Sequence, residues 1–128
     1  MAEGFAKHIL VGENFLIESA GTHPEGLNQI AIKVMGELGI NIEGQKSKSV
    51  EFINLEIFDV VVTVCDNAKN SCFLPSHKRI LQYNFLDPSL SEGAIDEQIV
   101  VYRQVRDELY TMVKELINNY NIICQELN

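Results

Sequence analysis

The sequence predicts an α/β domain in which a parallel sheet is flanked by helices. The first observation behind this prediction is a continuous apolar, β-branched run in the segment Phe58–Val64, which is typical of a strand buried on both faces. The second is that strand-like and helical patterns alternate along the chain. The third is the absence of any repeat or linker in the sequence, so residues 1–128 are expected to form one domain.

Four elements are predicted in the first half of the chain. In order, they are a short helix at residues 1–12, a strand at Asn14–Ala20, a helix at Leu27–Leu38 and a short helix at Val50–Asn54. Gly39 is suited to end the second helix, because glycine readily adopts a positive φ. Ile40 and Ile42 are expected to anchor the irregular connection that follows. Ser47 or Ser49 is expected to cap the short helix, whereas the opening helix has no capping residue before it.

The second half is predicted to hold two strands and one long helix. They are the central strand at Phe58–Val64, a short strand at Arg79–Phe85 and an amphipathic helix from about Ala94 to Ile123. The expected buried face of this helix consists of Ile99, Tyr102, Val105, Leu109, Met112, Val113, Leu116, Ile117 and Tyr120. The polar run within residues 102–108 is interpreted as a solvated face with local ion pairs.

The composition of the chain argues against some classes of binding partner. The net charge of −8 argues against a nucleic-acid partner, since phosphate backbones are bound by clustered Lys and Arg. A small oxyanion is still compatible, because one local site can be positive on an acidic surface. No apolar run approaches the roughly 18 residues of a membrane span, and no secretion signal is present. Three cysteines fit no disulfide framework, so we expect a cytoplasmic protein with reduced thiols and no membrane partner.

Cys65 and Cys72 are the first candidates for chemistry. Cys65 closes the central strand, and open α/β sheets place their sites at the carboxyl ends of strands. Cys72 can reach it only if the intervening loop coils back, because a disulfide needs Cα atoms about 4.4–6.8 Å apart. Lys69 would lower a nearby thiol pKa, and Asp66 works against this. From the residues alone, a reversible disulfide and a pair of inert cysteines stay equally open.

Asp87 is the third candidate. It follows the strand at Arg79–Phe85 and precedes Pro88, an arrangement typical of a turn. The functional alternative is a carboxyl general acid on a loop that faces the site.

Other polar residues are expected to be structural. The small residues at Ser19–Thr22 suit a tight exit from a strand. Cys124 is expected to pack in the last helix. His8, His23 and His77 lack ligand spacing, so neither a metal nor a cofactor is predicted.

Several segments of the chain form one larger pattern. They are Met1–Gly4, Ser19–Thr22, Ala31 and Met35 before Glu37–Ile40, Ser47–Ser49, Val61–Cys65 with Cys72 and Pro75, Asp87–Pro88, and Tyr102–Glu108. In order and spacing they resemble the thioredoxin-coupled arsenate reductases, which share the fold of low-molecular-weight protein tyrosine phosphatases. The likeness covers nearly the whole chain, and the paired cysteines favour the reductases over the phosphatases.

The resemblance implies parts that these 128 residues do not contain. Family members open with a strand and a C-x5-R-S loop, whose cysteine is the nucleophile and whose arginine and backbone N–H groups cradle the oxyanion. No C-x5-R pattern occurs here. The resemblance therefore implies an N-terminally truncated, low-molecular-weight phosphatase-like domain that is missing the first strand and this loop. Since that strand is interior in the family, residues 1–128 alone are expected to be unstable, swapped or aggregated.

The resemblance also implies a role for each candidate residue. The loop cysteine attacks arsenate, Cys65 attacks the loop cysteine and arsenite leaves, and Cys72 takes over the disulfide for reduction by thioredoxin. Asp87 acts as the acid. Without the loop, the 128-residue chain is expected to be inactive. Two alternatives stay open: a phosphatase that is indifferent to both cysteines, and a non-catalytic remnant or thiol-redox module that only forms the Cys65–Cys72 disulfide.

Overall fold

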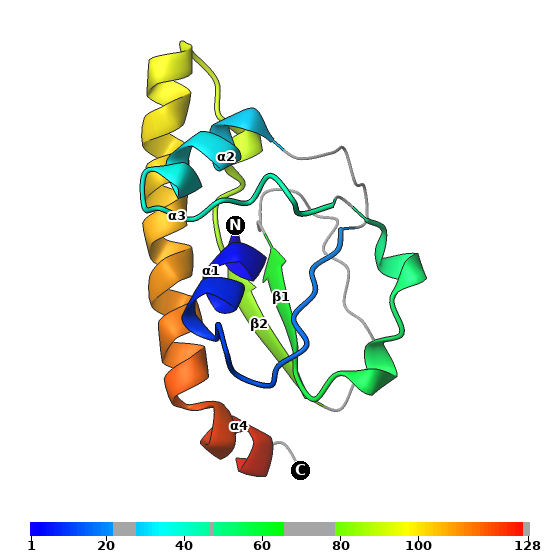
Figure 1. Ribbon diagram of the computed structural model, residues 1–128. Coiled ribbons are helices and arrows are strands. Elements are labelled where there is room, and N and C mark those ends of the chain that lie inside the picture. The colour runs from blue at the N-terminus through cyan, green and yellow to red at the C-terminus, as the bar shows by residue number, and fades with distance from the viewer. Residues whose placement is uncertain (22–27, 47, 66–78, 127–128) are drawn as a thin grey trace.

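The computed structural model of the chain describes residues 1–21, 28–46, 48–65 and 79–126. Its helices are α1 (Ala2–Ile9), α2 (Gln29–Gly36), α3 (Ile95–Asn118) and α4 (Tyr120–Glu126), and its strands are β1 (Val61–Cys65) and β2 (Ile80–Asn84). Short 3-10 helices are η1 (Val50–Phe52), η2 (Leu55–Ile57) and η4 (Pro88–Leu90). Figure 1 shows α1 and α2 lying along the long helix α3, with the two strands next to each other in the middle of the molecule.

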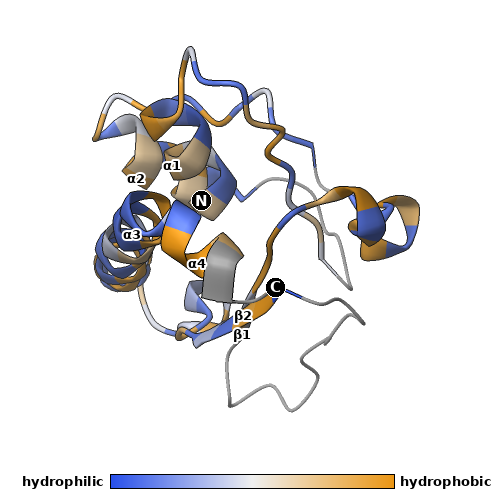
Figure 2. Ribbon diagram, turned by 90° about the horizontal axis from the view of Figure 1, so that it is seen from below, coloured by the Kyte–Doolittle hydropathy of each residue, from blue (hydrophilic) through white to orange (hydrophobic). Residues whose placement is uncertain are grey.

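β1 and β2 form a parallel pair. Their register runs from Val61 opposite Ile80 to Cys65 opposite Asn84. Because the strands run in the same direction, their carboxyl ends lie at the same edge of the sheet. Figure 2 shows α1, α2 and α3 grouped together, with the two strands outside this group. A parallel pair flanked by helices confirms the predicted α/β class.

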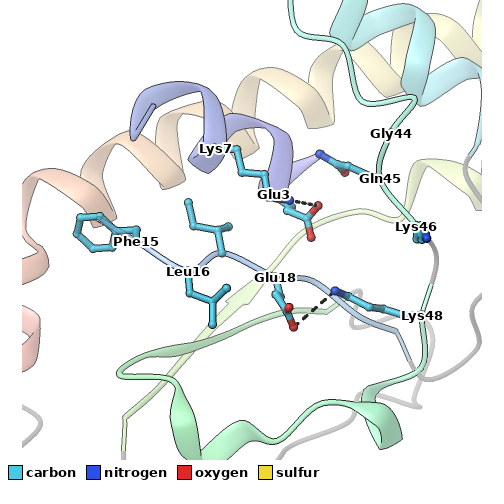
Figure 3. A pocket seen from close by; sticks show the side chains of 10 residues that line it. Glu3, Lys7, Phe15, Leu16, Glu18, Gly44, Gln45, Lys46 and Lys48 are labelled. Carbon is cyan, nitrogen blue, oxygen red and sulfur yellow. Dashed lines mark hydrogen bonds and ion pairs between the residues drawn. The ribbon is translucent and has the colours of Figure 1, made fainter. Parts of the chain in front are cut away.

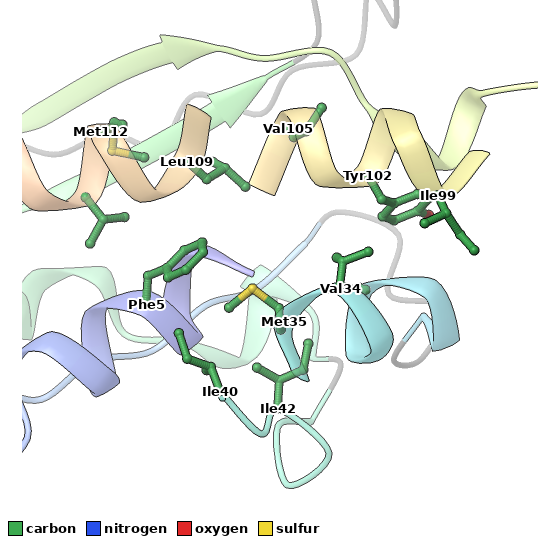
Figure 4. Close-up of a cluster of buried hydrophobic side chains, with 12 residues drawn as sticks. Phe5, Val34, Met35, Ile40, Ile42, Ile99, Tyr102, Val105, Leu109 and Met112 are labelled. Atoms are coloured by element: carbon green, nitrogen blue, oxygen red, sulfur yellow. The ribbon is translucent and has the colours of Figure 1, made fainter. Parts of the chain in front are cut away.

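The main hydrophobic core lies where α1 and α2 meet α3 (Figure 4). Its largest fully buried side chains are Phe5, Val34, Met35 and Ile42. Helix α3 contributes Ile99, Tyr102, Val105, Leu109, Met112 and Val113, all from its predicted apolar face. Complete burial of one such side chain contributes about 1.5–3 kcal/mol, so this three-helix contact is a main source of stability.

The helix predicted at Leu27–Leu38 is present as the shorter α2, and Asn28, which was not predicted as a cap, begins it. The Asn28 side chain caps the helix by accepting hydrogen bonds from the backbone N–H groups of Ile30 and Ala31 at 2.8 and 3.1 Å. Gly39 has a φ of +77°, which allows the chain to turn after the helix. Ile40 and Ile42 are then buried, with exposed fractions of 7% and 1%, and so anchor the connection as expected.

The predicted strand at Asn14–Ala20 is wrong, because the structure assigns no strand there. Its apolar residues are poorly covered, and Leu16 is 63% exposed. The only described sheet-like contact nearby is an isolated parallel bridge between Gly21 and Ser49. A strand requires a ladder of hydrogen bonds to a neighbour, and neither described strand pairs with this segment.

The expectation that the central strand is buried on both faces is also wrong. Val61, Val62 and Thr63 are half-buried, and Val64 is 50% exposed. The described sheet contains two strands, so among the described residues β1 pairs on one side only, with β2. The apolar composition of β1 is typical of a strand that is more deeply buried than β1 is among the described residues.

The long C-terminal helix is interrupted, whereas the sequence predicted one helix to Ile123. Helix α3 ends at Asn118, and Asn119 separates it from α4. The side-chain amide of Asn119 donates to the carbonyl oxygen of Glu115 at 2.8 Å, and the Asn119 backbone N–H reaches the same oxygen at 3.1 Å. Local side-chain bonds of this kind compete with regular helical ones and favour a helix end.

The polar run within residues 102–108 is more than the predicted solvated face. Arg106 is buried, with 8% of its surface exposed. It pairs locally with Asp107, but it also binds Glu37 of the α2 terminus at 2.9 Å. Arg103 binds the same carboxylate at 2.6 Å. The partner that draws Arg106 inward lies 69 residues away, so local spacing could not indicate it.

Candidate active site

The carboxyl edge of the sheet positions two of the three predicted site residues. Cys65 is the last residue of β1 and lies opposite Asn84, the last residue of β2. Asp87 follows three residues later at the start of η4. A thiol-bearing residue thus ends one strand, and a carboxyl-bearing residue follows the neighbouring strand at the same edge, where α/β folds place their chemistry. The third predicted residue, Cys72, falls in the segment 66–78, outside the described residues.

The Asp87 carboxylate is held by its own turn. Its Oδ1 atom accepts a hydrogen bond from the Ser89 backbone N–H at 2.9 Å and a second from the Ser89 hydroxyl at 2.6 Å. Pro88 occupies the first position of η4, where its fixed φ suits the helix start. This arrangement confirms the predicted Asp-Pro turn, and it restricts the orientation of the carboxylate.

Tyr102 is the titratable side chain that α3 places near this turn. It is 3% exposed. Burial raises the pKa of Tyr102, and the negative charge of Asp87 raises it further. Because η4 packs on α3, the turn that carries Asp87 rests on a helix surface where Tyr102 is a neutral phenol at physiological pH.

A second polar site lies between α1 and the segment after it. Figure 3 shows an open pocket of about 410 Å³, in which Glu3 lies beside Lys7 of the same helix and Glu18 lies beside Lys48 of a distant segment. Glu3 is buried, and its carboxylate accepts from Ser19 Oγ at 2.9 Å and pairs with Lys7 at 3.2 Å. Glu18 pairs with Lys48 at 3.5 Å.

The pocket next to Glu3 is distinct from the predicted catalytic residues. Its lining residues include neither Cys65 nor Asp87. Each of its two carboxylates already has a lysine partner, which satisfies the charge that a buried acid would otherwise leave uncompensated. We therefore interpret it as a structural contact that fixes the chain after α1.

Sequence reasoning missed Ser89 as a partner of the predicted acid. The available signal was a serine two residues after Asp87, a spacing at which a side-chain oxygen of Asp accepts from the backbone. The hydroxyl bond to the same oxygen depends on the Ser89 rotamer, and only the structure supplies it.

Other potential functional groups are accounted for within the described parts of the chain. There, no three His, Cys, Asp or Glu side chains gather as a metal site. Cys124, predicted to pack in the last helix, is half-buried. Among the helices in the described ranges, none is both long and apolar enough to cross a membrane.

Comparison with known proteins places this arrangement in a family. Residues 1–126 match the family model described as low molecular weight phosphotyrosine protein phosphatase. The chain is 40% identical to an arsenate reductase of Shouchella clausii over 116 residues, which cover 90% of this chain and 83% of the relative. It is 38% identical to an arsenate reductase of Bacillus subtilis over the same shares of the two chains.

Solved structures give the same result. One, described as an arsenate reductase in the phosphate binding state, aligns with a TM-score of 0.76 and 31% identity, covering 92% of this chain and 86% of that one. Another, described as an arsenate reductase in reduced state, aligns with a TM-score of 0.74 and 30% identity, covering 93% and 86%. The chain therefore belongs to the low molecular weight phosphotyrosine protein phosphatase family, and its relatives named here are arsenate reductases.

Proposed function

We propose that this chain carries the disulfide-relay part of an arsenate reductase. Cys65 and Cys72 are the resolving thiols, Asp87 is the acid, arsenate is the oxyanion and cytoplasmic thioredoxin is the reductant. The observation that supports this most directly is the placement of Cys65 and Asp87 after neighbouring parallel strands, in a chain whose relatives are named arsenate reductases. The structure described as phosphate-bound supports an oxyanion as the ligand class.

The proposed relay transfers two electrons from thiols to arsenic. A cysteine of the family's C-x5-R loop bonds to arsenate, and Asp87 donates a proton to the departing oxygen, which leaves as water. The Cys65 thiolate then attacks the loop sulfur. The sulfur–arsenic bond breaks, arsenite leaves with the electron pair, and a disulfide forms. Cys72 attacks Cys65, the loop thiolate is released, and the Cys65–Cys72 disulfide is reduced by the dithiol of thioredoxin.

The first nucleophile of this relay is not among the 128 residues, since they contain no C-x5-R pattern. We accordingly propose that the 128-residue chain alone does not reduce arsenate. Its contribution would be the second and third thiols and the acid. Arsenate turnover by the 128-residue chain with thioredoxin would contradict this part of the proposal.

The test uses the chain joined behind a family strand and C-x5-R-S loop, here called the loop-bearing chain. It is expected to reduce arsenate continuously with thioredoxin and thioredoxin reductase. Cys72→Ser should release one arsenite per chain and then stop, because the disulfide can no longer pass outward. Cys124→Ser, which removes the thiol outside the relay, should turn over normally. Continuous turnover by Cys72→Ser would overturn the relay assignment.

A phosphatase is the second candidate, favoured by the description of the matching family model. It predicts that the loop-bearing chain hydrolyses an aryl phosphate, that Asp87→Asn slows this reaction, and that Cys65→Ser and Cys72→Ser leave it unchanged. Aryl phosphate hydrolysis with no arsenate reduction would favour this candidate over the reductase.

A further inference from the structure

Two hydrogen bonds converge on a single oxygen of Asp87, and both come from Ser89. The backbone N–H donates to Oδ1 at 2.9 Å, and the hydroxyl donates to the same atom at 2.6 Å. The backbone bond survives almost any substitution of Ser89. The hydroxyl bond is therefore the part that this particular side chain adds.

The rest of the turn is held by separate contacts. The Leu90 backbone N–H donates to the carbonyl oxygen of Asp87 at 3.1 Å, and the Ser91 N–H donates to that of Pro88 at 3.1 Å. The Ser91 hydroxyl also donates to the Pro88 carbonyl at 2.6 Å. The backbone of η4 thus does not depend on the Ser89 hydroxyl, which points instead to a role at the carboxylate.

We propose that Ser89 is a positioning residue whose hydroxyl orients the Asp87 carboxyl through the bond to Oδ1. The two donors on Oδ1 hold that oxygen in one direction. The donors also oppose rotation about the Cα–Cβ bond of Asp87. This inference rests on the proposed role of Asp87 as the acid, and it names the group that orients this acid.

The expected consequence is a loss of rate without a loss of binding. A proton donor contributes only when it is aligned with the departing oxygen, so a rotating carboxyl slows the chemical step. Removing one hydrogen bond to a carboxylate is expected to lower kcat by about tenfold. The KM for arsenate should stay within about twofold, because Ser89 is not proposed to touch the substrate.

The loop-bearing chain provides the kinetic test, with a matched control in the same turn. Ser89→Ala should lower kcat, Ser89→Thr should restore it by keeping the hydroxyl, and Ser91→Ala should behave as wild type. In the loop-bearing chain, three-bond NMR couplings about the Asp87 Cα–Cβ bond should report one rotamer in wild type and Ser91→Ala. Ser89→Ala should give averaged couplings.

The possible outcomes distinguish the positioning role of Ser89 from the role of Asp87 as the acid. If Asp87→Asn is impaired and Ser89→Ala is not, the positioning role is overturned while the proposed function stands. If Asp87→Asn is as active as wild type, the role of the acid itself is overturned. Equal losses in Ser89→Ala and Ser91→Ala would show that the two serines only stiffen η4, which would also overturn the inference.

Discussion

Glu37 and Arg106 are joined across 69 residues of sequence by an ion pair in which the Glu37 Oε1 and Arg106 Nη1 atoms lie 2.9 Å apart. The same Arg106 nitrogen donates to the carbonyl oxygen of Val34 at 2.9 Å. The Arg103 guanidinium donates a hydrogen bond to the other carboxylate oxygen of Glu37 at 2.6 Å. These contacts fasten the end of α2 to α3 beside the buried core.

Replacing Arg106 is expected to destabilise the chain far more than replacing Arg103. The Arg106 side chain is 10% exposed, so Arg106→Met removes the donor to the buried Val34 carbonyl oxygen and one partner of Glu37, and should cost about 2–3 kcal/mol. The Arg103 side chain is 46% exposed, so its ion pair is screened by water and Arg103→Met should change the free energy of unfolding little. Urea unfolding monitored by circular dichroism measures both values. Equal losses would contradict a special role for the buried arginine.

Acid should weaken the same contact over a defined pH range. Hydrogen bonding to Arg103 is the largest cause that lowers the pKa of Glu37, to about 2 from 4.5. Because the folded pKa is depressed, the stabilisation is fully present above pH 4.5 and is lost as pH falls toward 2. Glu37→Gln should therefore melt below wild type at pH 6, and the two melting temperatures should converge near pH 2. A constant difference across this range would refute the assignment.

Two helical glycines should respond to alanine with opposite signs. At Gly4 of α1, an added Cβ would lie 2.7 Å from the Ile42 Cγ2 atom, so overpacking should outweigh helix propensity and lower stability by about 1 kcal/mol or more. At Gly36 of α2, no atom lies within 4 Å of an added Cβ, and Gly36→Ala should raise stability by about 0.5–1 kcal/mol. Thermal unfolding of both variants tests the packing at α1. If Gly4→Ala were more stable than wild type, the Ile42 side chain would be able to move away from the added Cβ at little cost in free energy.

The exposed strand β1 should promote self-association of the 128-residue chain. Val64 is 50% exposed on a strand that pairs on one side with β2. A lysine on an edge strand opposes pairing with another chain, so Val64→Lys should slow the rise of light scattering at raised protein concentration. Val100→Lys changes a similarly exposed valine, 59% exposed on helix α3, and should leave the scattering unchanged. Similar effects from both variants would indicate net charge rather than the strand edge.

Local patterns were enough to predict several elements. The spacing of apolar residues predicted α2 and the buried face of α3, because a helix that packs on one side repeats every 3.6 residues. Of the two caps proposed, Ser47 and Ser49, the structure shows Ser49, whose Oγ accepts from the Glu51 N–H at 3.4 Å. The positions of Cys65 and Asp87 after strands also followed from sequence. Each of these features depends on neighbours within a few residues.

The sequence by itself determined the α/β class, the family resemblance and the candidates Cys65, Cys72 and Asp87. Only the tertiary structure decided that residues 14–20 form no strand and that Arg106 turns inward to Glu37. The residue types in a segment indicate whether it prefers a buried or an exposed environment. Strand pairing and ion pairs, however, depend on partners that are distant in sequence. The orientation of Asp87 by the Ser89 hydroxyl is likewise a property of side-chain geometry, which no residue pattern specifies.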